Sequence, residues 1–94
     1  MREKQVEKKL VEAVRKRGGL CPKFISPGLT GVPDRIVLLP GGHMAFAELK
    51  APGCKPRPLQ AARGGQLRTL GFRVYVIDRI DQIGGVLDEI SSSF

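Results

Sequence analysis

The sequence has no tryptophan, one tyrosine, one histidine and two cysteines among its 94 residues. Cys21 and Cys54 lie far apart, and neither has a second Cys or a His at ligand spacing. Two reduced thiols are therefore expected in place of a zinc site. No apolar run approaches the ~20 residues needed to span a membrane. Residues 1–10 are charged throughout and lack the apolar centre of a signal peptide, so an intracellular protein is expected.

Acidic residues are scarce relative to basic ones. Sixteen Lys and Arg against nine Asp and Glu give a net charge of +7 and a pI near 10.0. This surplus indicates a polyanionic partner, with nucleic acid favoured over an anionic membrane because the basic N-terminal segment lacks bulky aromatic anchors. The glycine-rich segments match neither the P-loop nor the dinucleotide fingerprint, so no nucleotide cofactor is expected. The length fits a single domain, residues 1–94, with one functional site.

The order of the predicted elements is typical of an α/β sandwich. Residues 2–19 indicate a helix closed by Gly18 and Gly19, with an apolar face that Glu7 lies on or beside. The expected order is helix, three strands, helix, strand, helix. The later elements are expected as strands at 21–26, 34–40, 43–51 and 72–78 and as helices at about 59–70 and 81–92.

The helix expected at 59–70 carries Leu59, Leu67 and Leu70 on one face. Gly64 and Gly65 lie in its middle, where each costs about 1 kcal/mol relative to Ala. The sequence leaves their purpose open between the close approach of a backbone or a phosphate and a local break of the helix.

Three charged residues stand at the ends of the two central strands. Both strands, 34–40 and 43–51, are apolar on alternating positions of each face, as in strands buried in the middle of a sheet. Asp34 begins the first strand, and Glu48 and Lys50 end the second. Because side chains alternate along a strand, Glu48 and Lys50 share one face.

The position of Asp34 relative to that face depends on the hairpin connection. A two-residue turn at glycines 41–42 would place Asp34 opposite Leu49 and away from Glu48. A three-residue connection, or one bulge, would bring Asp34 onto the face of Glu48 and Lys50. We predict the second arrangement, because isolated charges on a buried sheet are costly and clustering around a cation removes most of that cost.

Such a cluster predicts phosphodiester chemistry. Two carboxylates with a backbone carbonyl between them make a hard, oxygen-rich site suited to Mg²⁺ or Mn²⁺. An ion of this kind can hold a phosphate oxygen and lower the pKa of a bound water for in-line attack. Lys50 could position that water or stabilise charge on the pentavalent phosphorus.

These residues resemble the PD-(D/E)xK nuclease signature, with Asp34 after Pro33 and Glu48-Leu49-Lys50 on the next strand. Nearly the whole chain is similar to the small stand-alone VRR-NUC (virus-type replication-repair nuclease) domains of phages. The motifs that carry this resemblance are an early helix with Glu7, then KFISPGLTGVPDRIVL, a glycine turn, FAELKAPG, Gln60 and GFRVYVID.

The resemblance implies a restriction-endonuclease-like core, with a central mixed sheet of about four strands flanked by helices in the order αβββαβα. It also implies a Mg²⁺- or Mn²⁺-dependent endonuclease. The implied metal ligands are Asp34, Glu48 and the Leu49 carbonyl, with Glu7 supporting the metal directly or through water, Lys50 serving catalysis and Gln60 orienting the site.

The DNA contacts and the assembly are further expectations. The basic residues that follow the ExK strand are expected to touch phosphate; they are Lys55, Arg57, Arg63 and Arg68. A short chain offers little surface for DNA, which favours a two-fold homodimer. The final helix and residues 72–78 are candidates for the dimer surface, because they carry apolar residues expected to be exposed, such as Tyr75 and Phe94. The resemblance adds branched DNA, such as Holliday junctions, as the substrate.

Two alternatives stay open from the sequence. The first is a nicking or general duplex nuclease without junction preference. The second is a binding module that holds DNA for a phage replication or recombination complex while its own site is weak or idle. Glu7 is also ambiguous, since the helix dipole alone favours acids near a helix start.

Overall fold

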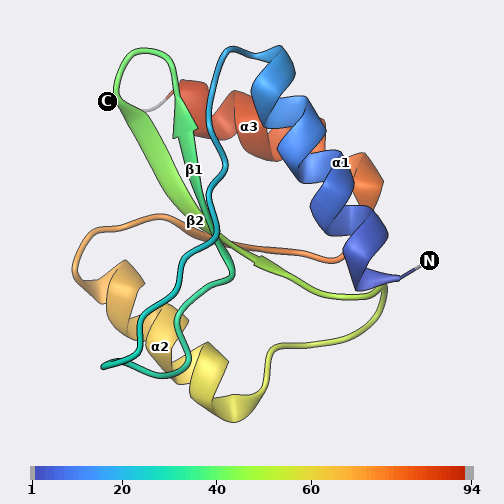
Figure 1. Cartoon of the computed structure of the whole chain (residues 1–94). Helices are drawn as coiled ribbons and strands as arrows, with labels where there is room; N and C mark the ends of the chain where they lie inside the picture. Colours follow the sequence, from blue (N-terminus) through green and yellow to red (C-terminus); the bar gives the residue numbers. More distant parts are fainter. Residues whose placement is uncertain (1, 93–94) are drawn as a thin grey trace.

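A computed structural model describes residues 2–92, which form a mixed three-stranded sheet between helices (Figure 1). Strand β2 lies in the middle, antiparallel to β1 and parallel to β3. No helix in this range is long and apolar enough to cross a membrane. The elements are α1 (Glu3–Lys16), β1 (Arg35–Leu39), β2 (His43–Leu49), α2 (Pro58–Thr69), β3 (Val74–Ile77), the 3₁₀ helix η1 (Ile80–Gln82) and α3 (Ile83–Ser91).

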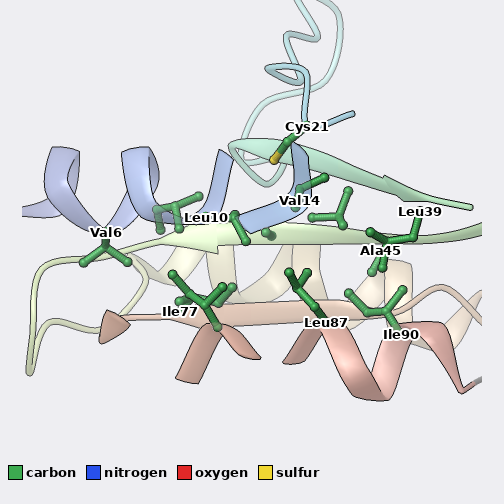
Figure 2. Close-up of a cluster of buried hydrophobic side chains, with 13 residues drawn as sticks. Val6, Leu10, Val14, Cys21, Leu39, Ala45, Ile77, Leu87 and Ile90 are labelled. Atoms are coloured by element: carbon green, nitrogen blue, oxygen red, sulfur yellow. The ribbon is translucent and has the colours of Figure 1, made fainter. Parts of the chain in front are cut away.

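The two faces of the sheet differ in how tightly they are covered. Helices α1 and α3 lie together on one face, and α2 lies apart from them (Figure 1). Across all three strands, odd-numbered residues point to α1 and α3, and even-numbered residues point to α2. The buried core lies on the odd-numbered face (Figure 2) and includes Val6, Leu10, Val14, Val37, Leu39, Ala45, Ala47, Leu49, Ile77, Leu87 and Ile90.

Helix α1 forms where the sequence predicts it. Val6, Leu10 and Val14 recur at four-residue spacing, so they make one stripe that is fully buried in the core. The helix ends where Gly18 takes a φ of 82° and its N–H donates to the Arg15 carbonyl. Glycine tolerates that left-handed conformation better than any other residue.

The expectation of about four strands is wrong, because the described part of the chain has three. The predicted strand at 21–26 lies beside β1 but forms only isolated bridges, at Leu20 with Leu38 and at Lys23 with Arg35. The Pro22 carbonyl accepts the Ile36 N–H, but proline has no N–H to return a bond. The ladder is therefore interrupted at its second hydrogen-bonded pair.

Helix α2 also departs from the sequence interpretation. It is continuous through Gly64 and Gly65, so the local break is wrong. Leu59 and Leu70 are 53% and 67% exposed, and Gly64 is the helix residue that is buried. The leucine face predicted for this helix is therefore not a core face, and α2 approaches the sheet through a residue without a side chain.

In the dimer-surface candidate 72–78, Phe72 is 46% exposed but Tyr75 is not an exposed residue. Tyr75 is half-buried against the core, and its hydroxyl donates to Glu89 Oε1 at 2.9 Å. Phe94 lies outside the described residues.

Gly31 is the point at which the loop before β1 packs against Leu59 at the start of α2. It has a φ of 77°, and a Cβ built there would lie 2.9 Å from both Cγ and the carbonyl oxygen of Leu59. Both the backbone conformation and the contact distance exclude a side chain. The glycine of the GVPD motif therefore lets this loop pack directly on α2, three residues before Asp34.

We predict that Gly31→Ala lowers the free energy of unfolding by about 1–3 kcal/mol, because it introduces both strain and a clash. Gly28→Ala is the matched control in the same loop, since Gly28 lacks a positive φ and a Cβ there would meet nothing within 4 Å. Urea unfolding followed by circular dichroism measures both variants. Equal stability of the two alanine variants would contradict this account of Gly31.

Candidate active site

The connection between β1 and β2 sets which charged residues meet. Leu39 pairs with His43, so the hairpin has three connecting residues, 40–42. Arg35 pairs with Ala47, and the same register continued by one residue places Asp34 opposite Glu48. The three-residue connection that the sequence analysis favours is confirmed, and Asp34, Glu48 and Lys50 share the even-numbered face of the sheet.

Asp34 is held by two hydrogen bonds. Its Oδ2 accepts the Leu49 N–H at 2.9 Å, which joins the carboxylate to the end of β2. Its backbone carbonyl accepts the Phe24 N–H at 2.9 Å, which fixes the loop in front of β1. The Leu49 N–H, which lies between Glu48 and Lys50, therefore orients the Asp34 side chain, and the Phe24 bond anchors the Asp34 backbone.

Glu48 is a buried carboxylate without hydrogen bonds among the described residues. It is 3% exposed, and within residues 2–92 neither of its carboxylate oxygens has a hydrogen-bond partner. The Lys50 ammonium lies 3.6 Å from Oε2, which is an ion-pair distance but too long for a hydrogen bond. Burial and then the neighbouring Asp34 charge raise the pKa of Glu48 to about 7, against an opposing effect of Lys50.

Glu7 belongs to a different ion pair. Its Oε2 accepts from Arg35 Nε at 2.9 Å, and Arg35 also donates from Nη1 to the Cys21 carbonyl at 2.7 Å. Among residues 2–92 no three Asp, Glu, His or Cys side chains gather closely enough to hold a metal ion. The structure therefore does not bring Glu7 to the pair formed by Asp34 and Glu48, and its water-mediated role stays a prediction.

Gln60 and Glu48 line one cavity between the sheet and α2. The cavity has a volume of about 100 Å³, and its wall includes Gly31, Pro33, Glu48, Gln60, Gly64, Arg68 and Val74. The Gln60 side chain turns back to its own helix, because its Oε1 accepts the Arg57 N–H at 3.0 Å. Gln60 thus caps the start of α2 at the edge of the space that Glu48 faces.

Gly64 in the same wall has no close neighbour that would exclude a methyl group. A Cβ there would meet Val74 Cγ1 and Arg68 Nη1 at 3.7 Å, which is ordinary contact. Close approach of a protein backbone therefore does not require this glycine. Its position in the wall instead leaves more of the cavity open beside Glu48, a role that the sequence alone could not assign.

The four predicted DNA-contact residues fall into two groups. Arg63 donates to the Thr30 carbonyl at 2.9 Å, and Arg68 donates to the Val74 carbonyl at 2.8 and 3.2 Å, so both already hold backbone segments together. Lys55 and Arg57 are exposed in and after the loop that follows β2. The second pair is better placed to meet phosphate from outside.

The donor set fits a hard divalent cation. Asp34 and Glu48 are two adjacent carboxylates, both Glu48 oxygens are buried and without hydrogen bonds in the part of the chain that the structure describes, and the Lys50 ammonium alone can balance only one of their two negative charges. Asp34 and Glu48 would hold Mg²⁺ or Mn²⁺, with the Leu49 backbone carbonyl as the third protein ligand that the sequence predicts. Mg²⁺ commonly takes one or two protein carboxylates and keeps several waters, so two carboxylates suffice.

Comparisons with known proteins identify the family of the fold. A scan against protein-family models finds no match. The chain is 52% identical over 81 residues to "Putative nuclease p44" of Acyrthosiphon pisum secondary endosymbiont phage 1, covering 86% of this chain and 87% of that protein. A solved structure described as "VRR_NUC domain" superposes with a TM-score of 0.85 at 32% identity, covering 92% of this chain and 94% of that one. With this fold, this identity and this coverage, the chain belongs to the VRR-NUC family.

Proposed function

We propose that this VRR-NUC protein is a Mg²⁺- or Mn²⁺-dependent endonuclease that hydrolyses DNA phosphodiester bonds at Asp34, Glu48 and Lys50. The observation that carries the proposal is Glu48, which is buried beside another carboxylate and has no hydrogen bond to either carboxylate oxygen within the described chain. A protein that only bound DNA would gain nothing from clustered carboxylates facing a polyanion. The same cluster is useful where a cation must be held against a phosphate.

The chain's own residues prepare the site for hydrolysis. A bound divalent ion would supply charge neutralisation at the phosphate and a water of lowered pKa. Asp34 is kept in one orientation by the Leu49 N–H, and Glu48 is kept dry by its burial. The Lys50 ammonium, 13% exposed and close to Glu48, is positioned to orient the attacking water or to stabilise the pentavalent phosphorus.

The DNA itself is proposed to lie over Lys55 and Arg57. Both are exposed and lie in the connection between β2 and α2. Pro56, which stands between them, lines the cavity that Glu48 faces. The net charge of +7 supports attraction to the DNA backbone. We further propose a single-domain homodimer that acts on branched DNA, such as Holliday junctions, in the interior of a host cell. Two-fold symmetry would then give paired incisions.

We predict that Asp34→Asn and Lys50→Met each reduce cleavage by about 100-fold or more, because each removes a group that acts on the transition state. Labelled four-way junction, flap, duplex and single-stranded substrates are compared with Mg²⁺, Mn²⁺ or EDTA. Asp88→Asn, the same change at an exposed site on α3, should cleave like the wild type. Tight DNA binding without any metal-dependent product would contradict the nuclease proposal.

We predict that Glu48→Gln stabilises the metal-free protein above neutral pH. The folded pKa of about 7 lies above the usual value of 4.5. Folding therefore becomes less favourable as Glu48 ionises, with a cost that grows as the pH rises through this window. At about pH 8 in EDTA the variant should gain ~1–3 kcal/mol, and near pH 4.5 the gain should vanish.

Thermal unfolding measures that gain, and added Mn²⁺ should raise the melting temperature of the wild type but not of Glu48→Gln. Equal or lower stability of Glu48→Gln at both pH values would show that the Glu48 carboxylate is already compensated without a cation.

We predict that Lys55→Ala/Arg57→Ala weakens DNA binding and reduces the dependence of log Kd on log salt by about two units, because two phosphate contacts are lost. Lys8→Ala/Lys9→Ala on α1 removes the same charge from the opposite face and should leave the slope unchanged. Fluorescence anisotropy in EDTA measures both variants. Identical slopes for the two variants would place the DNA elsewhere on the surface.

A further inference from the structure

A groove between the loop that precedes β1 and the start of α2 has no role in the hydrolysis described above. Its volume is about 500 Å³, and we name it the apolar groove. It is lined chiefly by Phe24, Ile25, Leu29, Arg57 and Leu59.

The apolar side chains of this groove are unusually exposed. Ile25 is 76%, Leu59 53% and Leu29 42% exposed. Leu59 belongs to the leucine stripe that would be buried if α2 packed on the sheet through that face. The fold does not use these side chains for its core, and grouped exposed apolar residues beside a candidate active site are typical of a binding surface.

The apolar groove adjoins the cavity beside Glu48. Gly31 and Gln60 line both, so an occupant of the groove would lie next to the space that Glu48 faces. The backbone of Phe24 in the groove wall is also joined to that of Asp34, because the Phe24 N–H donates to the Asp34 backbone carbonyl. Gly31 packs on Leu59, which fixes the groove's two sides relative to each other.

Basic side chains beside the apolar groove favour an anionic ligand. Arg57 lines the groove and is exposed, and Lys55 lies two residues before it. An apolar surface next to basic side chains is the combination that binds unpaired nucleotides, where bases contact the apolar part and the backbone meets the cations. Phe24, which stacks on Phe46 at 5.5 Å between ring centroids, adds an aromatic ring to the lining.

We propose that the apolar groove binds the unstacked base of an unpaired nucleotide beside the cleaved phosphate. The inference rests on the proposed nuclease function and names its substrate class more closely. A base inside a duplex has both faces covered by its neighbours, whereas an unpaired nucleotide at a branch, flap or gap can offer a face to Ile25, Leu29 and Leu59.

The test measures binding in EDTA, so it does not depend on cleavage. Two branched DNAs are compared that differ only at one unpaired nucleotide next to the branch, which carries either adenine or an abasic analogue. The wild type is expected to bind the adenine form about tenfold more tightly, a typical effect for one base contact. Ile25→Ser/Leu59→Ser should bind both forms equally, because the base has lost its apolar partners.

Leu20→Ser/Leu70→Ser is the matched control. These residues are 66% and 67% exposed, lie outside the groove, and one of them ends the same helix as Leu59. The control should keep the adenine preference. Absence of a preference in the wild type, or its retention in Ile25→Ser/Leu59→Ser, would overturn the proposal.

A measurement of the assembly state tests whether the groove instead binds a second copy of the chain. Ile25→Ser/Leu59→Ser should keep the assembly state of the wild type in sedimentation equilibrium. If it instead changes that state and leaves the adenine preference intact, the groove is a contact between copies of the chain and the proposal fails. If the wild type shows the preference but never cleaves DNA, the groove proposal stands and the nuclease proposal fails.

Discussion

The three-residue connection of the β1–β2 hairpin is the constraint on which the site depends. Because side chains alternate along a strand, a connection one residue shorter would move Asp34 to the face of Leu49, which α1 and α3 cover. The observed register keeps Asp34 with Glu48 on the α2 face and sends Arg35 to the α1 face, where it pairs with Glu7. The alternation of side chains along β1 therefore places Asp34, a candidate metal ligand, and Arg35, which pairs with Glu7, on opposite faces of the sheet.

The two faces of the sheet divide stability from function. The hydrophobic stabilisation lies mainly on the α1 and α3 side, where the largest buried residues gather. The α2 side is packed less completely, with Gly64 against the sheet, a cavity beside Glu48 and exposed leucines at both ends of the helix. A buried carboxylate with a raised pKa can persist there because the opposite face supplies the core.

Local sequence patterns were enough to predict α1 and the pairing of Asp34 with Glu48, whereas the number of strands and the packing of α2 depend on long-range contacts. The spacing of Val6, Leu10 and Val14 was enough for α1, and strand alternation with the cost of isolated charges was enough for the Asp34–Glu48 pairing. The sequence could not predict that Pro22 would interrupt a fourth strand, because that depends on which β1 residue it faces. It could not predict the exposure of Leu59 or the place of Gly64 in the cavity wall either, since both follow from which side of α2 turns to the sheet.

The proposed nuclease site requires Asp34 and Glu48 to hold a divalent cation together. Anomalous diffraction from crystals grown with Mn²⁺, recorded for the wild type and for Glu48→Gln, locates that cation. We expect a manganese peak bonded to both carboxylates in the wild type and lost in the variant. A wild-type peak that lacks either carboxylate, or no peak near Glu48 at saturating Mn²⁺, would contradict that expectation.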